Sequence, residues 1–132
     1  MFRITKLTDY ALVLLNEMDD KIPLSARTLN LKTQVPLATT NKILKSLVTH
    51  QICSSKGGKS GGFYLSHPKN EISLLQIIQA IEGHDKKFTD CNLVKDGKDC
   101  SLKHNCKISH KMSQIDKEIH QLLSSKLLSE LT

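Results

Sequence analysis

Three cysteines, Cys91, Cys100 and Cys106, lie within sixteen residues with the spacing C-x8-C-x5-C. Thiolates are ligands of zinc and of iron–sulfur clusters, and these clusters typically take four protein ligands. Neither gap matches the C-x2-C pair that is typical of zinc ribbons and thioredoxin-type redox sites. The spacing therefore favours an iron–sulfur cluster, while a zinc site and free redox-active thiols are kept as alternatives.

The sequence leaves the fourth ligand of such a site open. His110 follows Cys106 by four residues, so on a helix the two side chains would share one face. His104 is less well placed, two residues before Cys106, and a carboxylate from elsewhere is a further alternative. The fourth cysteine, Cys53, stands apart in a predicted strand. We expect it to be an ordinary small buried residue.

Basic residues are concentrated in one long stretch of the chain. The 132 residues carry a net charge of +6, and the fifty residues from Lys21 to Asn70 contain eight basic residues and no Asp or Glu. The rest of the chain holds eleven basic and thirteen acidic residues, a net charge of −2. Phosphate contacts need Lys and Arg on one face without acids among them. The stretch therefore predicts nucleic-acid binding.

Hydrophobic periodicity predicts the elements that position these residues. Helices are expected at 7–18, 26–33 and 37–50, with a fourth between Ser73 and Gly83 and a long last one over 107–131. Ser25 and Ser73 are the expected N-caps. Strands at 52–55 and 63–65 are joined by a loop that holds four of the six glycines. The predicted fold is mainly α with a small β-hairpin wing: a winged helix-turn-helix (1–83), a cysteine loop (84–106) and a C-terminal dimerisation helix (107–132).

In a winged helix-turn-helix, the third helix enters the major groove and the wing lies against phosphates or the minor groove. Asn reads adenine, Lys reads guanine, and Thr contacts a base or a phosphate. The predicted DNA-contacting residues are Arg27, Thr39, Thr40, Asn41, Lys42, Lys45, Lys56, Lys59 and Ser60.

Other function classes are disfavoured. Gly58-Lys59-Ser60 resembles the end of a phosphate-binding loop, but Cys53 stands where that motif needs glycine. No catalytic triad or carboxylate pair rises above chance, so we expect no enzyme and no small-molecule substrate. No apolar run approaches the roughly 20 residues of a membrane span, and no secretory signal is evident, so a cytoplasmic protein is expected. A thiol redox protein without DNA binding is the remaining rival.

The chain resembles the bacterial winged-helix regulators of the Rrf2 family, of the IscR and NsrR type. The opening RITKLTDYA at 3–11 is most similar to the branch that regulates SUF-type iron–sulfur assembly genes. The motifs that carry the resemblance are LTDYA at 7–11, KILKSL at 42–47, GGFYL at 61–65, EISL at 71–74 and IQAIEG at 78–83, followed by the three cysteines.

The resemblance implies a homodimer joined by the C-terminal helix, operator DNA as partner, and an iron–sulfur cluster as the switch. Loading, loss or nitrosylation of the cluster would change how the two recognition helices are held. The genes implied are those of iron–sulfur assembly or of redox and nitric oxide stress. A 2Fe-2S cluster is favoured and a 4Fe-4S cluster is the alternative; either is expected to be lost easily in air.

The resemblance also implies ligands, because the three cysteines fall where the family's cluster cysteines fall. IscR-like members use a histidine three residues after the last cysteine, a position held here by Ser109, with His110 one residue later. NsrR-like members use an aspartate of the partner subunit, which corresponds to Asp9. The first cysteine gap is longer than the family's five residues. Asn41 replaces the glutamate with which IscR reads its sites, and Lys56 stands where arginine is usual.

Overall fold

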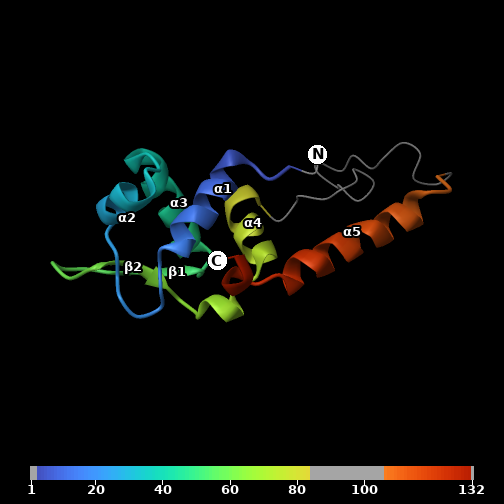
Figure 1. Cartoon of the computed structure of the whole chain (residues 1–132). Helices are drawn as coiled ribbons and strands as arrows, with labels where there is room; N and C mark the ends of the chain where they lie inside the picture. Colours follow the sequence, from blue (N-terminus) through green and yellow to red (C-terminus); the bar gives the residue numbers. More distant parts are fainter. Residues whose placement is uncertain (1–2, 84–105, 132) are drawn as a thin grey trace.

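The computed structural model describes residues 3–83 and 106–131, and the elements follow the predicted order (Figure 1). The predicted cysteine loop, with Cys91, Cys100 and His104, lies outside the described residues apart from Cys106. The elements are helices α1 (Lys6–Asn16), α2 (Ala26–Thr33) and α3 (Leu37–Thr49), strands β1 (Cys53–Lys56) and β2 (Gly62–Leu65), the 3₁₀ turn η1 (Lys69–Glu71), helices α4 (Leu74–Glu82) and α5 (Ser109–Ser125), and the 3₁₀ turn η3 (Leu128–Leu131). The mainly helical winged-helix prediction is confirmed.

The core lies where α1, α3 and α4 meet, and apolar residues at helical spacing form it. Val48, Leu74 and Ile81, which helical spacing also places on the core side, are only half-buried. The fully buried members are Ala11, Leu14 and Leu15 of α1, Leu29 of α2, Ile43, Leu44 and Leu47 of α3, and Ile77 of α4, each with 0% of its surface exposed.

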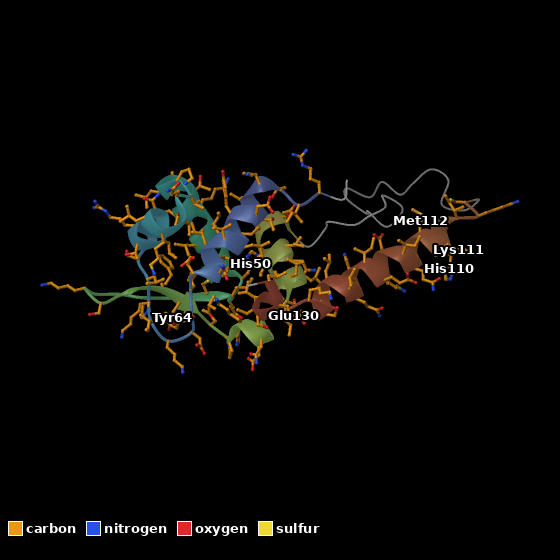
Figure 2. The ribbon with its side chains drawn as sticks, viewed as in Figure 1. His50, Tyr64, His110, Lys111, Met112 and Glu130 are labelled. Carbon is orange, nitrogen blue, oxygen red and sulfur yellow. The ribbon has the colours of Figure 1, made fainter. Side chains whose placement is uncertain are left out.

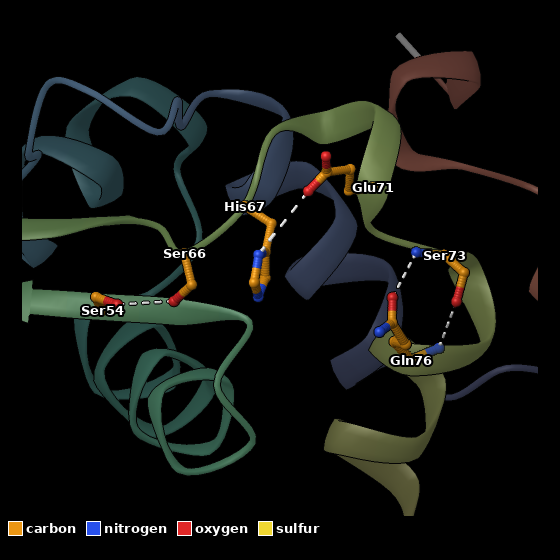
Figure 3. Close-up of polar contacts among 6 residues, drawn as sticks. All are labelled: Ser54, Ser66, His67, Glu71, Ser73 and Gln76. Atoms are coloured by element: carbon orange, nitrogen blue, oxygen red, sulfur yellow. Dashed lines mark hydrogen bonds and ion pairs between the residues drawn. The ribbon is translucent and has the colours of Figure 1, made fainter.

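Side-chain caps start the helices at the predicted places. The Ser25 hydroxyl accepts a hydrogen bond from the Thr28 N–H at 3.0 Å, which caps α2. At α4, the Ser73 hydroxyl accepts from the Gln76 N–H at 3.2 Å, and Gln76 Oε1 accepts from the Ser73 N–H at 2.8 Å (Figure 3). This reciprocal capping box fixes the start of α4, and Gly83, with a φ of +96°, ends it.

The wing is an antiparallel hairpin in which Cys53 pairs with Leu65 and Lys56 pairs with Gly62. Leu24 joins β2 through two backbone hydrogen bonds with Phe63, at 2.8 and 2.9 Å. A Cβ on Gly62 would lie 2.6 Å from the Leu24 carbonyl, so only glycine allows this approach. The wing is therefore tied to the segment that enters α2.

The C-terminal helix is shorter than predicted. α5 ends at Ser125, and the chain then returns to the body, where the Leu74 N–H donates to the Lys126 carbonyl and the Leu128 N–H donates to the Ile72 carbonyl, both at 2.8 Å. An isolated β-bridge between Ser73 and Leu127 keeps this segment extended, which ends the helix. The prediction of one helix over 107–131 is therefore wrong at its C-terminal end, and Leu127 and Leu131 lie outside α5.

α5 extends away from the body (Figure 1), and within the described residues its apolar side is partly exposed. Ile115 is 39% exposed and Leu122 is 57% exposed. Together with the half-buried Met112, Ile119 and Leu123, they form what we call the α5 stripe. The division into 1–83, 84–106 and 107–132 stays a prediction, although Leu128 already belongs to the core of the first unit.

The return of the C-terminus yields a stability prediction. Leu128 is 1% exposed, so Leu128→Ala should lower the free energy of unfolding by about 2–5 kcal/mol, because it leaves a cavity beside Ile72. Leu131 lies in the same 3₁₀ turn but is 47% exposed, so Leu131→Ala should change it by less than about 0.5 kcal/mol. Urea titration of both variants checks this. Equal losses would contradict the burial described here.

Candidate nucleic-acid interface and cysteine site

A tight turn between α2 and α3 presents the third helix to solvent. Gln34 has the left-handed φ of 63° and ends α2, and Asn30 Nδ2 donates to the Val35 carbonyl at 2.7 Å. Val35 itself is 3% exposed and anchors the turn in the core. These contacts fix how α3 leaves α2, which is the geometry that a helix-turn-helix needs.

The exposed side of α3 carries amide and ammonium groups. Asn41, Lys42 and Lys45 are exposed, and Thr39 is half-buried at the edge of this side. The first turn of α3 contains no acidic residue, and Pro36 provides no side-chain cap. The first backbone N–H groups of a helix lack intrahelical partners and favour anions. This side of α3 is therefore suited to a polyanion that also displays hydrogen-bonding edges.

Thr40 does not lie on that side, and the prediction that it is exposed is wrong. Its side chain is 0% exposed, and its hydroxyl donates to the Val35 carbonyl at 3.3 Å. Thr40 precedes Ile43 by three residues and Leu44 by four, so it belongs to the buried stripe. This spacing indicates that Thr40 is buried, whereas the polar hydroxyl of threonine had suggested an exposed position.

The wing adds a second group of exposed basic residues. Lys56 ends β1, while Lys59 and Ser60 lie in the exposed loop between the strands. Gly58 in this loop has a φ of +91°, a conformation that side-chain-bearing residues rarely adopt. Arg27 is exposed near the start of α2. Eight of the nine predicted DNA-contacting residues are thus wholly or partly accessible, Thr40 being the exception.

Of the candidate metal ligands, the structure describes Cys106, His110 and Asp9. Cys106 is half-buried, and its carbonyl accepts a hydrogen bond from the Ser109 hydroxyl at 3.2 Å. α5 begins only at Ser109, so the helical spacing that predicted a shared face for Cys106 and His110 does not apply. His110 is exposed near the end of α5 that lies away from the body (Figure 2). Asp9 is exposed in the first turn of α1.

Within residues 3–83 and 106–131, no group of three or more His, Cys, Asp or Glu side chains is placed to hold a metal ion. Two of the predicted thiol ligands, Cys91 and Cys100, lie outside these ranges. The ligand set therefore stays a prediction.

One contact that the sequence did not suggest joins the start of α1 to the end of α4. Thr8 is 0% exposed, and its hydroxyl donates to Glu82 Oε2 at 2.7 Å. Thr8 precedes Asp9, and Glu82 ends α4 just before residue 84. The hydrogen bond therefore ties the first turn of α1 to the last residue of α4. Thr8 precedes Ala11 by three residues, so its burial was readable from spacing.

The chain is similar to known proteins over nearly its whole length. The family of iron-dependent transcriptional regulators named Rrf2 matches it over residues 4–132. The chain belongs to the Rrf2 family.

Relatives and solved structures agree with the Rrf2 assignment. The curated relative YffB of Lactococcus lactis, which is named as an HTH-type transcriptional regulator, is 27% identical over 124 residues, or 92% of this chain and 80% of the relative. CymR, the global cysteine regulator of B. subtilis, superposes with a TM-score of 0.72 at 19% identity, over 99% of this chain and 96% of CymR. IscR of T. potens superposes with a TM-score of 0.67 at 18% identity, over 98% and 85% of the two chains.

The predicted family and winged-helix fold are confirmed, and this Rrf2 chain is a transcriptional regulator. At under 20% identity, the two structural neighbours show the fold alone, so the IscR and NsrR subtype stays a prediction. In the part of the chain that the structure describes, no helix has the length and apolar character that crossing a membrane requires.

Cys53 differs from Cys106 in reactivity. Cys53 is 2% exposed, as predicted, and burial raises the pKa of its thiol from 9.0 to about 12. Only the thiolate is nucleophilic and Cys53 is shielded by burial, so in metal-free, reduced protein at pH 8 iodoacetamide should alkylate Cys53 much more slowly than the half-buried Cys106. Peptide mass spectrometry over time measures both rates. In guanidinium chloride the two should converge, and similar rates in the native protein would contradict the burial of Cys53.

Proposed function

We propose that this Rrf2 regulator binds operator DNA as a homodimer and that an iron–sulfur cluster on its cysteines controls the affinity. The observation that carries the DNA-binding part is the exposed side of α3, which presents Asn41, Lys42 and Lys45 and is free of acidic residues, together with the exposed lysines of the wing. Phosphate contacts dominate affinity for DNA, and acids on this side would repel the phosphates.

The residues divide by what they would contact. An α-helix fits the major groove, where Asn41 can bond adenine in a bidentate manner and Lys42 or Lys45 can bond guanine. Lys56, Lys59, Ser60 and Arg27 are suited to phosphates, which position the protein without reading sequence. Thr39, at the edge of the exposed side, is suited to a phosphate.

In the proposed dimer, a second copy of the chain packs on the α5 stripe. Exposed leucine and isoleucine side chains at helical spacing on a protruding helix keep apolar surface in contact with water, which is unfavourable. Another apolar face that packs on them would bury this surface. A two-fold dimer through α5 would leave both recognition helices free. Their spacing must then match a DNA repeat of about 34–36 Å, so a small change at the dimer interface changes affinity.

The donor chemistry fits an iron–sulfur cluster. Cys91, Cys100 and Cys106 would supply three thiolates, the ligands that such clusters prefer, and the family description names iron. Either His110 or Asp9 of the partner subunit would complete the site, and both side chains are accessible. When bound, the cluster would supply redox and ligand-binding chemistry. The hydrogen bond from Thr8 to Glu82 would hold the α1 turn carrying Asp9 and the start of the cysteine segment together.

The DNA-binding part predicts a specific salt dependence. Lys59→Ala should weaken binding to all duplexes alike. It should also make the plot of log binding constant against log salt concentration less steep by about one, since each phosphate contact contributes about 0.9 to the steepness. Lys117→Ala removes an exposed lysine of α5, outside the proposed interface, and should leave the slope unchanged. Fluorescence anisotropy from about 50 to 200 mM salt measures both. Equal slopes for Lys59→Ala and the unsubstituted protein would exclude the wing from the interface.

If a cluster controls DNA binding, removing one of its cysteine ligands should remove the iron and also change the affinity for operator DNA. Protein purified without oxygen should contain iron and sulfide, and Cys106→Ala should abolish both and change operator affinity by roughly 5–150-fold. Cys53→Ala, which removes a thiol outside the proposed site, should keep iron, sulfide and affinity. Elemental analysis, a visible spectrum and anisotropy provide the readouts.

The alternative outcomes are distinct. Zinc in place of iron, or no metal after reconstitution, would overturn the cluster and move sensing to zinc or to the free thiols. A Cys106→Ala protein that lacks the cluster but binds like the loaded protein would overturn the coupling between cluster and DNA.

A further inference from the structure

The first turn of α3 begins with two exposed apolar residues, on a helix whose other exposed residues are polar. Leu37 is 44% exposed, and Ala38 is exposed as well. We infer that Leu37 and Ala38 form an apolar contact that recognises the C5-methyl groups of thymines in the operator. This inference rests on the proposed DNA binding and deepens it by naming the base that these residues select.

The local structure has no evident need for either side chain. The residue before the N-cap and the residue four positions into a helix often pack together as a hydrophobic staple. At α3 these are Val35 and Thr40, which are 3% and 0% exposed. The same two residues share the hydrogen bond from the Thr40 hydroxyl to the Val35 carbonyl. Leu37 and Ala38 therefore lie outside the contacts that fix the start of the helix.

Their position on the helix coincides with the proposed base-reading side. Ala38 precedes Lys42 by four residues and Lys45 by seven, so the three share one side of α3. Leu37 precedes Asn41 by four residues and lies one turn before it. In helix-turn-helix proteins, the N-terminal residues of the recognition helix contact the base edges. A base step read by Asn41 would thus have Leu37 beside it.

The chemistry of the groove selects the ligand. Base edges in the major groove present donors and acceptors, with one apolar exception, the C5-methyl group of thymine. An exposed leucine at the start of a helix that carries lysines gains nothing from phosphate or from polar base edges, but it removes surface from water when it packs on this methyl group. The lysines around it and the absence of acids in the stretch from Lys21 to Asn70 favour duplex DNA over an apolar protein partner.

Deoxyuridine tests the inference directly, because it lacks only the methyl group of thymine. Duplexes are first selected from a random library with the full-length protein. Each thymine of the selected duplex is then replaced by deoxyuridine, and affinities are measured by anisotropy. At one or two positions in each half-site, the replacement should weaken binding about fourfold, the value of one buried methylene-sized group.

Two variants assign the effect to α3. Leu37→Ala should bind thymine and deoxyuridine duplexes equally well at the position next to that read by Asn41. Val13→Ala, which trims a side chain of α1 with 46% exposure, should keep the discrimination. Tight binding without any thymine preference, or a preference that survives in Leu37→Ala, would overturn the inference while DNA binding stands. Failure to bind any duplex would overturn the proposed function, and this inference with it.

Discussion

Burial of one side of α3 constrains the rest of this molecule. Ile43, Leu44 and Leu47 pack in the core against α1 and α4, so the opposite side of the same helix is the one that reaches solvent. Thr40 shows how strict this division is, because a residue suited to DNA by type is fully buried by position. The exposed groups of α3 then have a defined order along the helix, with two apolar residues first and amide and ammonium groups after them.

The C-terminal segment also packs into this core. After α5, the chain returns and inserts Leu128 among the core residues next to Ile72, with backbone hydrogen bonds to the start of α4. α5 is thus anchored to the body at its C-terminal end, while its N-terminal end extends outward (Figure 1). In the proposed dimer, a change at the cysteine site would reach the recognition helices through this anchored helix and through the hydrogen bond between Thr8 and Glu82.

The two cysteines that the structure describes differ in how far their thiols are buried. Cys53 sits in β1 in the core, and its thiol stays protonated because burial disfavours the thiolate. Cys106 lies half-buried before α5 and keeps an accessible surface. Metal binding and oxidation both need an accessible thiolate, so the core cysteine is unsuited to sensing whichever chemistry the other three perform.

Sequence alone determined the order of the elements, the capping serines, the helical periodicity of α1 and α3, and the family, because periodicity and capping are local and the motifs are contiguous. It did not reveal that α5 stops at Ser125, since that end depends on a bridge between Ser73 and Leu127. Nor did it bury Thr40 or pair Thr8 with Glu82, although helical spacing indicated that both threonines are buried. These features were decided by tertiary structure, because they depend on which surfaces distant segments cover and on which carbonyl or carboxylate the fold brings within hydrogen-bonding distance.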